Sequence, residues 1–528
     1  MKGLPVSIQT FEKIRENGLT YVDKTDYIHQ LVSQNAYFFL ARPRRFGKSL
    51  LLTTIKSYFE GRKDLFDGLY IAEKEKEWEK YPIIHIDYSL IEYARGDEIF
   101  LNSLLFHLQQ RARRSEIDLA AKSVSDAFEE LIISLYKKYN QKVVILIDEY
   151  DKPMVDVLTE PKRFRENRAV LAKFYGAMKG LDHYFRFVML TGISRFAKAN
   201  VFSGMNNLRD ISMDDNFSCI VGFTEEELNH YFPELIQDVA DKFKVELAVI
   251  KQEIRRMYNG FSWNGKDRLY NPFSIFNFFL DREFGNYWFF SGTPSFLIEL
   301  IRAEKFIPSQ LELIETPDLE GYTKDVNYLP IGPLLFQTGY LTIKKIRYEG
   351  FQQIFHLDYP NAEVRISFIR YLLADFTRKQ QHQISPATSG LKDALRTENF
   401  DRFITILQAF ISDIPARLHL PKEAYYHSIC YMILRLLGVQ LLLEKETSKG
   451  RIDAVLELTD KVYIIEFKFG KEGGRIKRVE TLAQKAIEQI QKNKYAEAYR
   501  ADDRKVILFG IGFLNKSLYG KAVSLQNK

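Results

Sequence analysis

The chain has 528 residues, of which 46% are hydrophobic and 27% are charged. This length predicts more than one domain, and the composition supplies enough apolar residues for several cores, which excludes a disordered chain. No run of about 18 uninterrupted apolar residues occurs, so we expect no membrane span. The two cysteines, Cys219 and Cys430, exclude a disulfide framework and a cysteine zinc site, and they favour a cytoplasmic protein.

Positive charge is concentrated at the end of the chain. The formal net charge is +6, but residues 461–528 alone hold 15 Lys and Arg against 7 Asp and Glu, a balance of +8. Such an excess is typical of a solvated basic face or of a surface that attracts nucleic-acid phosphates. Charge alone does not decide between these interpretations.

Short apolar runs alternate with longer amphipathic stretches over the first 200 residues. The apolar runs predict buried strands at Tyr37–Ala41, Ile83–Ile86, Val143–Ile147 and Phe185–Leu190. Helical patterns lie between them, for example at Leu50–Phe59 and Ile99–Arg111. This alternation predicts an α/β fold with a parallel sheet and helices on both faces, and we expect it to form a first domain over residues 1–223.

The segment from Arg42 to Ser49 lies between the first predicted strand and a helix, which is the setting of a phosphate-binding loop. Lys48 would reach the β- and γ-phosphates of ATP, and Ser49 would bind Mg²⁺. The usual pattern has Gly where this chain has Arg42, so that Arg42 either tolerates the local geometry or points outward. A chance Gly-Lys-Ser at a helix start is the alternative. The residues expected to contact ATP are Arg44, Arg45, Phe46, Gly47, Lys48, Ser49 and Leu50.

Two later strand ends carry polar residues that complete this predicted site. The strand Val143–Ile147 is followed by Asp148, which would hold Mg²⁺ through water, and by Glu149, which would polarise the attacking water. Thr191, at the end of the next strand, would sense the γ-phosphate, with Ser194 as the second choice. Arg195 could supply charge to a neighbouring subunit, although a capped turn explains this last segment equally well.

After Phe223 the pattern changes to helices with few strands. We expect a helical lid or winged-helix-like extension over residues 224–300, and Thr224 with the acids behind it predicts a helix start. Residues 301–392 are interpreted as a connector. A last domain is expected over residues 393–528.

The last domain combines a helical region with three strands, a helix and a further strand. The predicted strands are Val439–Glu446, Ile452–Leu458, Val462–Phe467 and Lys505–Gly510, and the helix between the last two is Leu482–Lys494. Glu466 and Lys468 share one face of their strand because side chains alternate, and Asp453 can reach them if the strands pair. Two carboxylates can bind Mg²⁺ beside a lysine for phosphodiester hydrolysis, whereas the isolated pattern favours a surface salt bridge.

Several motifs in the first part resemble those of the bacterial AAA-ATPase-like family. The resemblance extends over about residues 5–300 and rests on Tyr21–Thr25, Arg42–Ser49, Ile147–Asp151, Thr191–Ser194 and Phe202–Leu208. It implies a P-loop fold with an additional strand, a family in which the first loop Gly is commonly Arg. It also implies that the segment Asp23–Thr25 lies near the nucleotide.

Residues 393–528 resemble the PD-(D/E)XK nuclease superfamily, a restriction-endonuclease-like αβββαβ fold. The resemblance rests on Glu423–His427, Gly450–Asp453, Glu466–Lys468 and Ala486–Ile490. It implies that Glu423 is a helix carboxylate, that Asp453 and Glu466 bind the metal, that Lys468 is catalytic and that Gln489 assists. His427 is interpreted as a packed side chain. The basic loop Lys471–Arg478 would contact DNA phosphates or would simply be solvated.

Together these patterns predict a protein that binds and hydrolyses ATP and cleaves nucleic acid, expected to be DNA, with Mg²⁺. The alternative is a nucleotide-switched regulator whose last domain binds nucleic acid or a partner without cutting it. We expect ATP and Mg²⁺ as cofactors and no membrane partner, and the sequence is compatible with a homo-oligomer.

Overall fold

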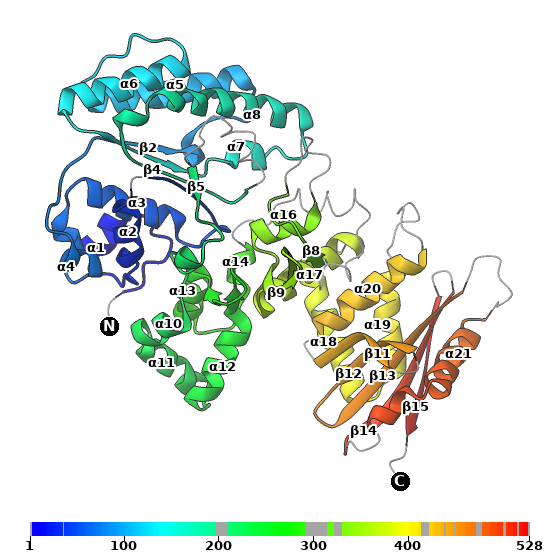
Figure 1. Cartoon of the computed structure of the whole chain (residues 1–528). Coiled ribbons are helices and arrows are strands. Elements are labelled where there is room, and N and C mark those ends of the chain that lie inside the picture. Colours follow the sequence, from blue (N-terminus) through cyan, green and yellow to red (C-terminus); the bar gives the residue numbers. More distant parts are fainter. Residues whose placement is uncertain are drawn as a thin grey trace. The chain divides into compact units, whose positions relative to one another are not determined.

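The computed structural model describes residues 3–34, 36–195, 208–290, 314–321, 330–377, 379–412, 422–437, 440–447, 450–470, 478–499, 503–514 and 517–525. It divides into two compact units (Figure 1). Unit 1 comprises Met1–Leu300 and Leu313–Arg365, and unit 2 comprises Ile301–Glu312 and Ile366–Lys528.

The core of unit 1 is a five-stranded parallel sheet in the order β2-β3-β4-β1-β5. The strands are β1 Tyr37–Ala41, β2 Ile83–Asp87, β3 Val143–Asp148, β4 Phe185–Gly192 and β5 Leu208–Asp210. All six residues of β3 are buried, as expected for a parallel sheet covered on both faces. Because β4 lies between β1 and β3, the sheet has the additional strand that the sequence resemblance implies.

Helices cover both faces of this sheet. In Figure 1, α5, α6 and α8 lie together on one side and α3 lies on the other. The helices up to β5 are α1 Phe11–Glu16, α2 Thr25–Val32, α3 Lys48–Phe59, α4 Tyr70–Lys74, α5 Asp97–Arg114, α6 Val124–Tyr139, α7 Lys152–Val155 and α8 Pro161–Gly176. None of the helices within the described ranges has the length and apolar composition needed to cross a membrane.

The rest of unit 1 is mainly helical. Its helices are α10 Glu225–Tyr231, α11 Pro233–Phe243, α12 Leu247–Tyr258, α13 Pro272–Asp281, α14 Tyr287–Phe290 and α16 Ile331–Thr338. Thr224 starts α10 with a capping box to Glu227, at the predicted helix start. A short pair, β6 Asn259–Phe261 and β7 Leu269–Tyr270, and a small sheet of β8 Ile314–Thr316, β10 Gln352–Asp358 and β9 Thr342–Glu349 complete the unit.

The segment expected to be a connector, residues 301–392, is divided between the two units. Leu313–Arg365 belongs to unit 1, and the chain from Ile366 belongs to unit 2. Helix α17, Ala362–Thr377, contains this boundary. The physical reason is that β8, β9 and β10 form their own hydrogen-bonded sheet, with buried residues such as Ile343 and Leu357, and do not extend as a linker.

Unit 2 has a mixed sheet in the order β11-β12-β13-β14-β15. Strands β11 Gln440–Thr447, β12 Gly450–Glu457 and β13 Lys461–Gly470 are antiparallel neighbours, and β14 Lys505–Leu514 is parallel to β13. The connection between β13 and β14 contains α21, Val479–Lys492. This is the predicted αβββαβ arrangement, to which β15, Ser517–Leu525, adds an antiparallel edge strand. The helices before the sheet are α18 Gln381–Arg396, α19 Phe400–Ser412 and α20 Lys422–Leu436.

Two glycines let α21 lie directly on β14. A Cβ atom on Gly510 would lie 2.4 Å from the Ala483 carbonyl oxygen, and one on Gly512 would lie 2.5 Å from the Val479 carbonyl oxygen. Both contacts are with helix backbone, which cannot move aside as a side chain can. Glycine at these positions therefore sets the distance between α21 and the sheet.

Candidate active sites

The segment after β1 has the backbone geometry of an anion-binding loop. Gly47 precedes helix α3 and has φ 99°, and Arg45 has φ 66° although it is not glycine. Left-handed residues within a short loop turn successive N–H groups toward one side, and the N-terminus of α3 adds partial positive charge there. The loop and helix start therefore form a cradle for a phosphate group.

Lys48 lies on this cradle and is held by the loop itself. Its Nζ donates hydrogen bonds to the carbonyl oxygens of Arg42 at 2.9 Å and Pro43 at 3.0 Å. Burial lowers the pKa of Lys48, while the carboxylates of Asp148 and Glu149 act in the opposite direction. A phosphate would offer this buried ammonium charged acceptors in place of neutral carbonyls, which form weaker hydrogen bonds.

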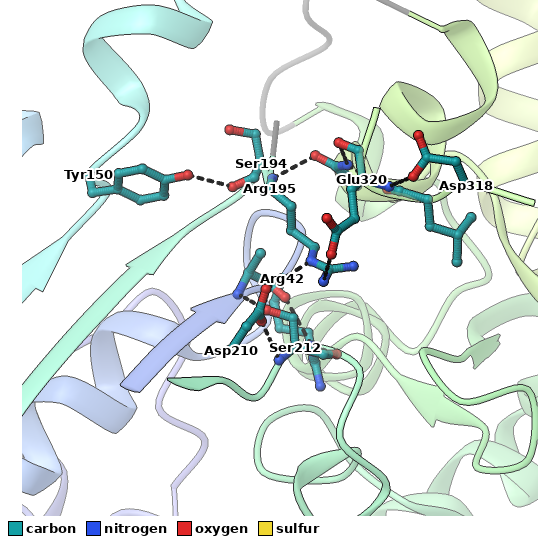
Figure 2. Close-up of polar contacts among 11 residues, drawn as sticks. Arg42, Tyr150, Ser194, Arg195, Asp210, Ser212, Asp318 and Glu320 are labelled. Atoms are coloured by element: carbon teal, nitrogen blue, oxygen red, sulfur yellow. Dashed lines mark hydrogen bonds and ion pairs between the residues drawn. The ribbon is translucent and has the colours of Figure 1, made fainter. Parts of the chain in front are cut away.

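Arg42, at the position of the usual glycine, points into the protein (Figure 2). Its side chain is fully buried, and it donates to the carbonyl oxygens of Ala41 at 2.9 Å, Ser212 at 2.6 Å and Phe217 at 3.3 Å. Its guanidinium also stacks over the ring of Trp263, 4.1 Å from the centroid. Of the two expectations for Arg42, the outward orientation is therefore wrong, because the segment after β5 provides buried acceptors for the charged group.

The acidic residues after β3 lie at the same edge of the sheet as the loop. Asp148 is buried and accepts a hydrogen bond from the Thr191 hydroxyl at the end of β4. Glu149 has φ 52°, and its burial raises its pKa. Asp87, at the end of β2, is paired in register with Asp148 and contributes to the high pKa of Glu149. Asp87 was not predicted as a site residue, although an acid directly after the predicted strand Ile83–Ile86 was the available signal.

The turn after β4 is fastened to the turn after β3. Asp151 is buried and accepts hydrogen bonds from the N–H and hydroxyl groups of Ser194, and from the N–H of Ile193. The Tyr150 hydroxyl donates to the Ser194 carbonyl oxygen at 2.8 Å (Figure 2). Ser194 therefore joins two turns, and of the two sensor candidates it is Thr191 that contacts Asp148.

Arg195 forms its ion pairs within unit 1. Its Nε lies 3.1 Å from Asp210 Oδ2, and its Nη2 lies 2.6 Å from Glu320 Oε1 (Figure 2). Only 11% of the side chain is exposed. In this conformation two carboxylates of unit 1 compensate the guanidinium, and a role of Arg195 at a neighbouring subunit stays a prediction.

A mostly apolar pocket opens beside the loop. Phe46, Gly47 and Leu50 line it from the loop and α3, and Tyr21, Val22 and Lys24 line it from the N-terminal segment. Asp23 is a structural residue, since it accepts hydrogen bonds from the backbone N–H groups of Thr25 and Tyr70. The segment that the resemblance places near the nucleotide thus contributes Lys24 to the same pocket as the loop.

A second polar cluster lies in unit 2, where β12, β13 and α21 meet. Glu466 Oε1 lies 3.2 Å from Lys468 Nζ and accepts a hydrogen bond from Gln489 Nε2. Asp453 Oδ2 accepts a hydrogen bond from the Phe467 N–H at 2.8 Å, which places it beside Glu466. Lys468 is therefore not a surface salt-bridge partner alone, because the carboxylate that it contacts is only 2% exposed.

Glu466 has the properties of an incomplete metal ligand. Burial and the neighbouring charge of Asp453 raise its pKa to about 7. Its Oε2 atom is buried and has no hydrogen-bond partner among the described residues, which is costly for a carboxylate oxygen. Within the described residues no group of three His, Cys, Asp or Glu side chains converges on one point. The pair suits a cation that keeps several waters, as Mg²⁺ does.

Two family models match the chain. One, described as a predicted AAA-ATPase, matches residues 5–202, and the other, the PD-(D/E)XK nuclease superfamily, matches residues 421–521. An uncharacterized protein in the vnfD 5' region of Azotobacter chroococcum mcd 1 is 36% identical over 525 residues, which are 98% of this chain and 97% of that protein. The chain belongs to the same family as this relative. It is an AAA-ATPase-like protein with a C-terminal PD-(D/E)XK nuclease domain.

In this AAA-ATPase-like protein the predicted loop residues divide by role. Phe46 is buried and packs against Phe261 and Trp263, so only its backbone faces the cradle. Arg45 stacks on the ring of Phe273, 4.9 Å from its centroid, and Arg44 lies 3.7 Å from Asp156. Ser49 follows Lys48 in the first turn of α3.

The nuclease-like domain brings together four of the five residues predicted for it, namely Asp453, Glu466, Lys468 and Gln489. Glu423 lies on α20, but its side chain is outside the described residues, as is the loop 471–477. His427 packs against the rings of Phe467 and Phe469, with its Nε2 3.9 Å from Asp453 Oδ1.

Proposed function

We propose that unit 1 binds and hydrolyses ATP. Three features beside the phosphate-binding loop support this proposal. They are the buried Lys48, the acid pair Asp148 and Glu149, and the apolar pocket. Phosphates would lie on the loop, and the adenine would enter the pocket beside Phe46. Glu149, with its raised pKa, suits a group that polarises water.

We propose that unit 2 cleaves the phosphodiester backbone of nucleic acid, with DNA as the expected substrate. The observation that carries this proposal is the buried Glu466 oxygen without a partner, beside Asp453 and Lys468. A protein that only bound nucleic acid would gain nothing from a buried carboxylate oxygen that no donor contacts, whereas such an oxygen suits a metal ligand.

The residues of this chain suggest a division of labour at the nuclease site. Asp453 and Glu466 would hold Mg²⁺, which when bound lowers the pKa of water and neutralises phosphate charge. Gln489 fixes the orientation of the Glu466 carboxylate. Lys468 Nζ lies 3.2 Å from this carboxylate and would stabilise the negative charge that develops on the phosphate.

A nuclease assay on the full chain tests this proposal. Linear, circular and single-stranded DNA, and RNA of the same sequence, are incubated with Mg²⁺ or Mn²⁺, each with and without ATP. We expect metal-dependent cleavage that Lys468→Ala abolishes while ATP binding persists. Equal cleavage by wild type and Lys468→Ala would assign the activity to a contaminant.

The second candidate is a nucleotide-switched regulator whose unit 2 binds nucleic acid without cutting it. It would be favoured by metal-independent binding with no cleavage of any substrate in the same assay. We retain the cytoplasmic location and a homo-oligomer as further proposals; mass measurement with and without ATP tests the latter.

A further inference from the structure

The outer side of the phosphate-binding loop is held by residues from distant parts of unit 1. The Arg44 carbonyl oxygen accepts a hydrogen bond from the Trp288 indole Nε1 at 3.1 Å. The Phe46 carbonyl oxygen accepts one from the Gly222 N–H at 3.2 Å. Together with a longer hydrogen bond of 3.5 Å from Asn271 Nδ2 to the same Arg44 oxygen, these contacts fix the direction of two of the peptide groups in the loop.

A trans peptide group links these contacts to the cradle. Its C=O and N–H bonds point in opposite directions, so a carbonyl held outward turns the next N–H inward. The Arg44 carbonyl sets the Arg45 N–H in this way, and the Phe46 carbonyl sets the Gly47 N–H. Within the described residues neither N–H has a hydrogen-bond partner, so both are available to a phosphate.

Trp288 is itself fixed by a buried carboxylate. Its backbone N–H donates to Glu363 Oε1 at 2.7 Å, and the Ser274 hydroxyl donates to Glu363 Oε2 at 2.8 Å. Glu363 is fully buried, and Trp288 is 6% exposed and packs on Tyr340 with 5.3 Å between ring centroids. The indole therefore has little freedom to leave Arg44.

The loop and Trp288 also meet at Gly339, which ends helix α16. A Cβ atom on Gly339 would lie 2.7 Å from Pro43 Cβ and 3.2 Å from Trp288 Cζ2. Gly339 has φ 89°, a conformation that glycine adopts readily. The close packing of Gly339, Pro43 and Trp288 holds the loop in one position relative to the indole.

We propose that Trp288 is a positioning residue of the phosphate-binding loop and that Glu363 holds it in place. Trp288 acts through the Arg44–Arg45 peptide group and does not touch the nucleotide. This inference rests on the proposed ATP site. It adds a link between that site and α17, because Glu363 lies in the first turn of the helix in which the chain passes from unit 1 to unit 2.

The test compares two tryptophans of unit 1 in the full chain. Trp288→Phe removes the indole N–H that orients Arg44, whereas Trp78→Phe removes a half-buried indole whose Nε1 atom has no hydrogen-bond partner among the described residues. We expect Trp288→Phe to weaken ATP binding about fivefold, the effect of one lost hydrogen bond, and Trp78→Phe to leave it within about twofold. ATP affinity is measured by titration calorimetry.

Equal affinities of wild type and Trp288→Phe would overturn the inference while leaving the ATP site intact. Absence of ATP binding by wild type would overturn the site and the inference together. Because Trp288→Phe also changes packing, benzothienylalanine at position 288, which replaces only the N–H by sulfur, should show the same weakening. Full affinity with this analogue would likewise overturn the role of the N–H.

The role of Glu363 is tested by rescue and by a double-mutant cycle. Glu363→Gln keeps an oxygen that can accept from the Trp288 N–H and should retain ATP affinity, whereas Glu363→Ala should weaken binding as Trp288→Phe does. The double variant Glu363→Ala/Trp288→Phe should be no weaker than Trp288→Phe alone. Additive losses would show that Glu363 does not act through Trp288.

Hydrogen exchange tests the link to α17. In wild type, ATP should slow exchange of the amides in the first turn of α17, and Trp288→Phe should remove much of this protection. Protection that is the same in both proteins, or absent from both, would contradict a link through Trp288.

Discussion

The two candidate sites of this protein each combine a lysine with carboxylates, but they use them in opposite ways. In unit 1, Lys48 donates to carbonyl oxygens of its own loop, and backbone N–H groups provide the rest of the cradle. In unit 2, Lys468 contacts the carboxylate of Glu466, whose second oxygen has no partner. On the functions proposed above, the first site receives an anion, and the second receives a cation before its anionic substrate.

This difference explains how each site is supported. The phosphate-binding loop presents backbone groups, and no side-chain ligands fix its shape. Hydrogen bonds from Arg42 and Trp288 therefore hold the loop from outside. A strand pair already has a fixed register, and there the requirement is a helix close enough for Gln489 to reach Glu466. Variants that exchange or remove these supporting residues should therefore affect the two sites differently.

The largest expected effect is that each of two lysine variants loses one activity and keeps the other. Lys48→Ala should weaken ATP binding by roughly 10- to 100-fold, because it removes charge-assisted hydrogen bonds to phosphate. Lys468→Ala should lower cleavage by roughly 10²- to 10³-fold and leave ATP binding unchanged, because its ammonium stabilises charge in unit 2 alone. Calorimetry and single-turnover cleavage measure the two effects. Loss of ATP binding in Lys468→Ala would contradict the assignment of separate sites.

Replacing Arg42 by glycine should damage the loop although it restores the usual motif. The change removes a buried group that donates to Ser212 and Phe217, so unit 1 should lose about 3 kcal/mol of unfolding free energy. Denaturant unfolding of Arg42→Gly measures this loss. Arg256→Ala, whose side chain is 53% exposed, is the control and should change stability by less than about 0.5 kcal/mol. An Arg42→Gly protein as stable as wild type would show that the arginine is not an anchor.

Adding a methyl group under α21 should disturb the nuclease site from a distance. Gly510→Ala places a Cβ atom against the Ala483 carbonyl oxygen, so overpacking should cost about 1–3 kcal/mol and displace Gln489 from Glu466. Cleavage should fall while ATP binding persists. Gly390→Ala in α18 is the matched control, because its added methyl meets only the flexible ends of the Ile406 and Arg402 side chains. Unchanged cleavage in Gly510→Ala would separate α21 from the site.

The smallest effect is a gain in stability on losing the metal ligand. The pKa of Glu466 is raised to about 7, so without metal its contribution to stability is fully present below about pH 4.5 and is lost as pH rises through 7. Glu466→Gln should therefore raise the melting temperature at pH 8, by about 2–4 °C per kcal/mol, and change it little at pH 4.5. Mg²⁺ should stabilise wild type and not the variant. A Glu466→Gln protein less stable than wild type at pH 8 would refute this account.

Local sequence patterns predicted the strands because the residues that a buried strand contributes to the core are consecutive in the sequence. The run Val143–Ile147 became β3, Val143–Asp148, and Ile83–Ile86 became β2, Ile83–Asp87. The edge strands β5 and β15 were missed. Three residues are too few for a pattern, and β15 alternates exposed and partly buried residues without an apolar run, since an edge strand packs weakly.

The sequence by itself predicted the order of the two domains, the phosphate-binding loop and the meeting of Glu466 with Lys468 and Asp453, because spacing along strands and at helix starts carries that information; Gln489 was implied by the family resemblance alone. Only the tertiary structure decided that Arg42 points inward, that Arg195 is neutralised by Asp210 and Glu320, and that Trp288 orients Arg44. Each of these contacts joins residues more than ten positions apart, most of them more than a hundred. The burial of a charge or a peptide group depends on the residues that pack against it. The sequence around the charge does not identify those residues.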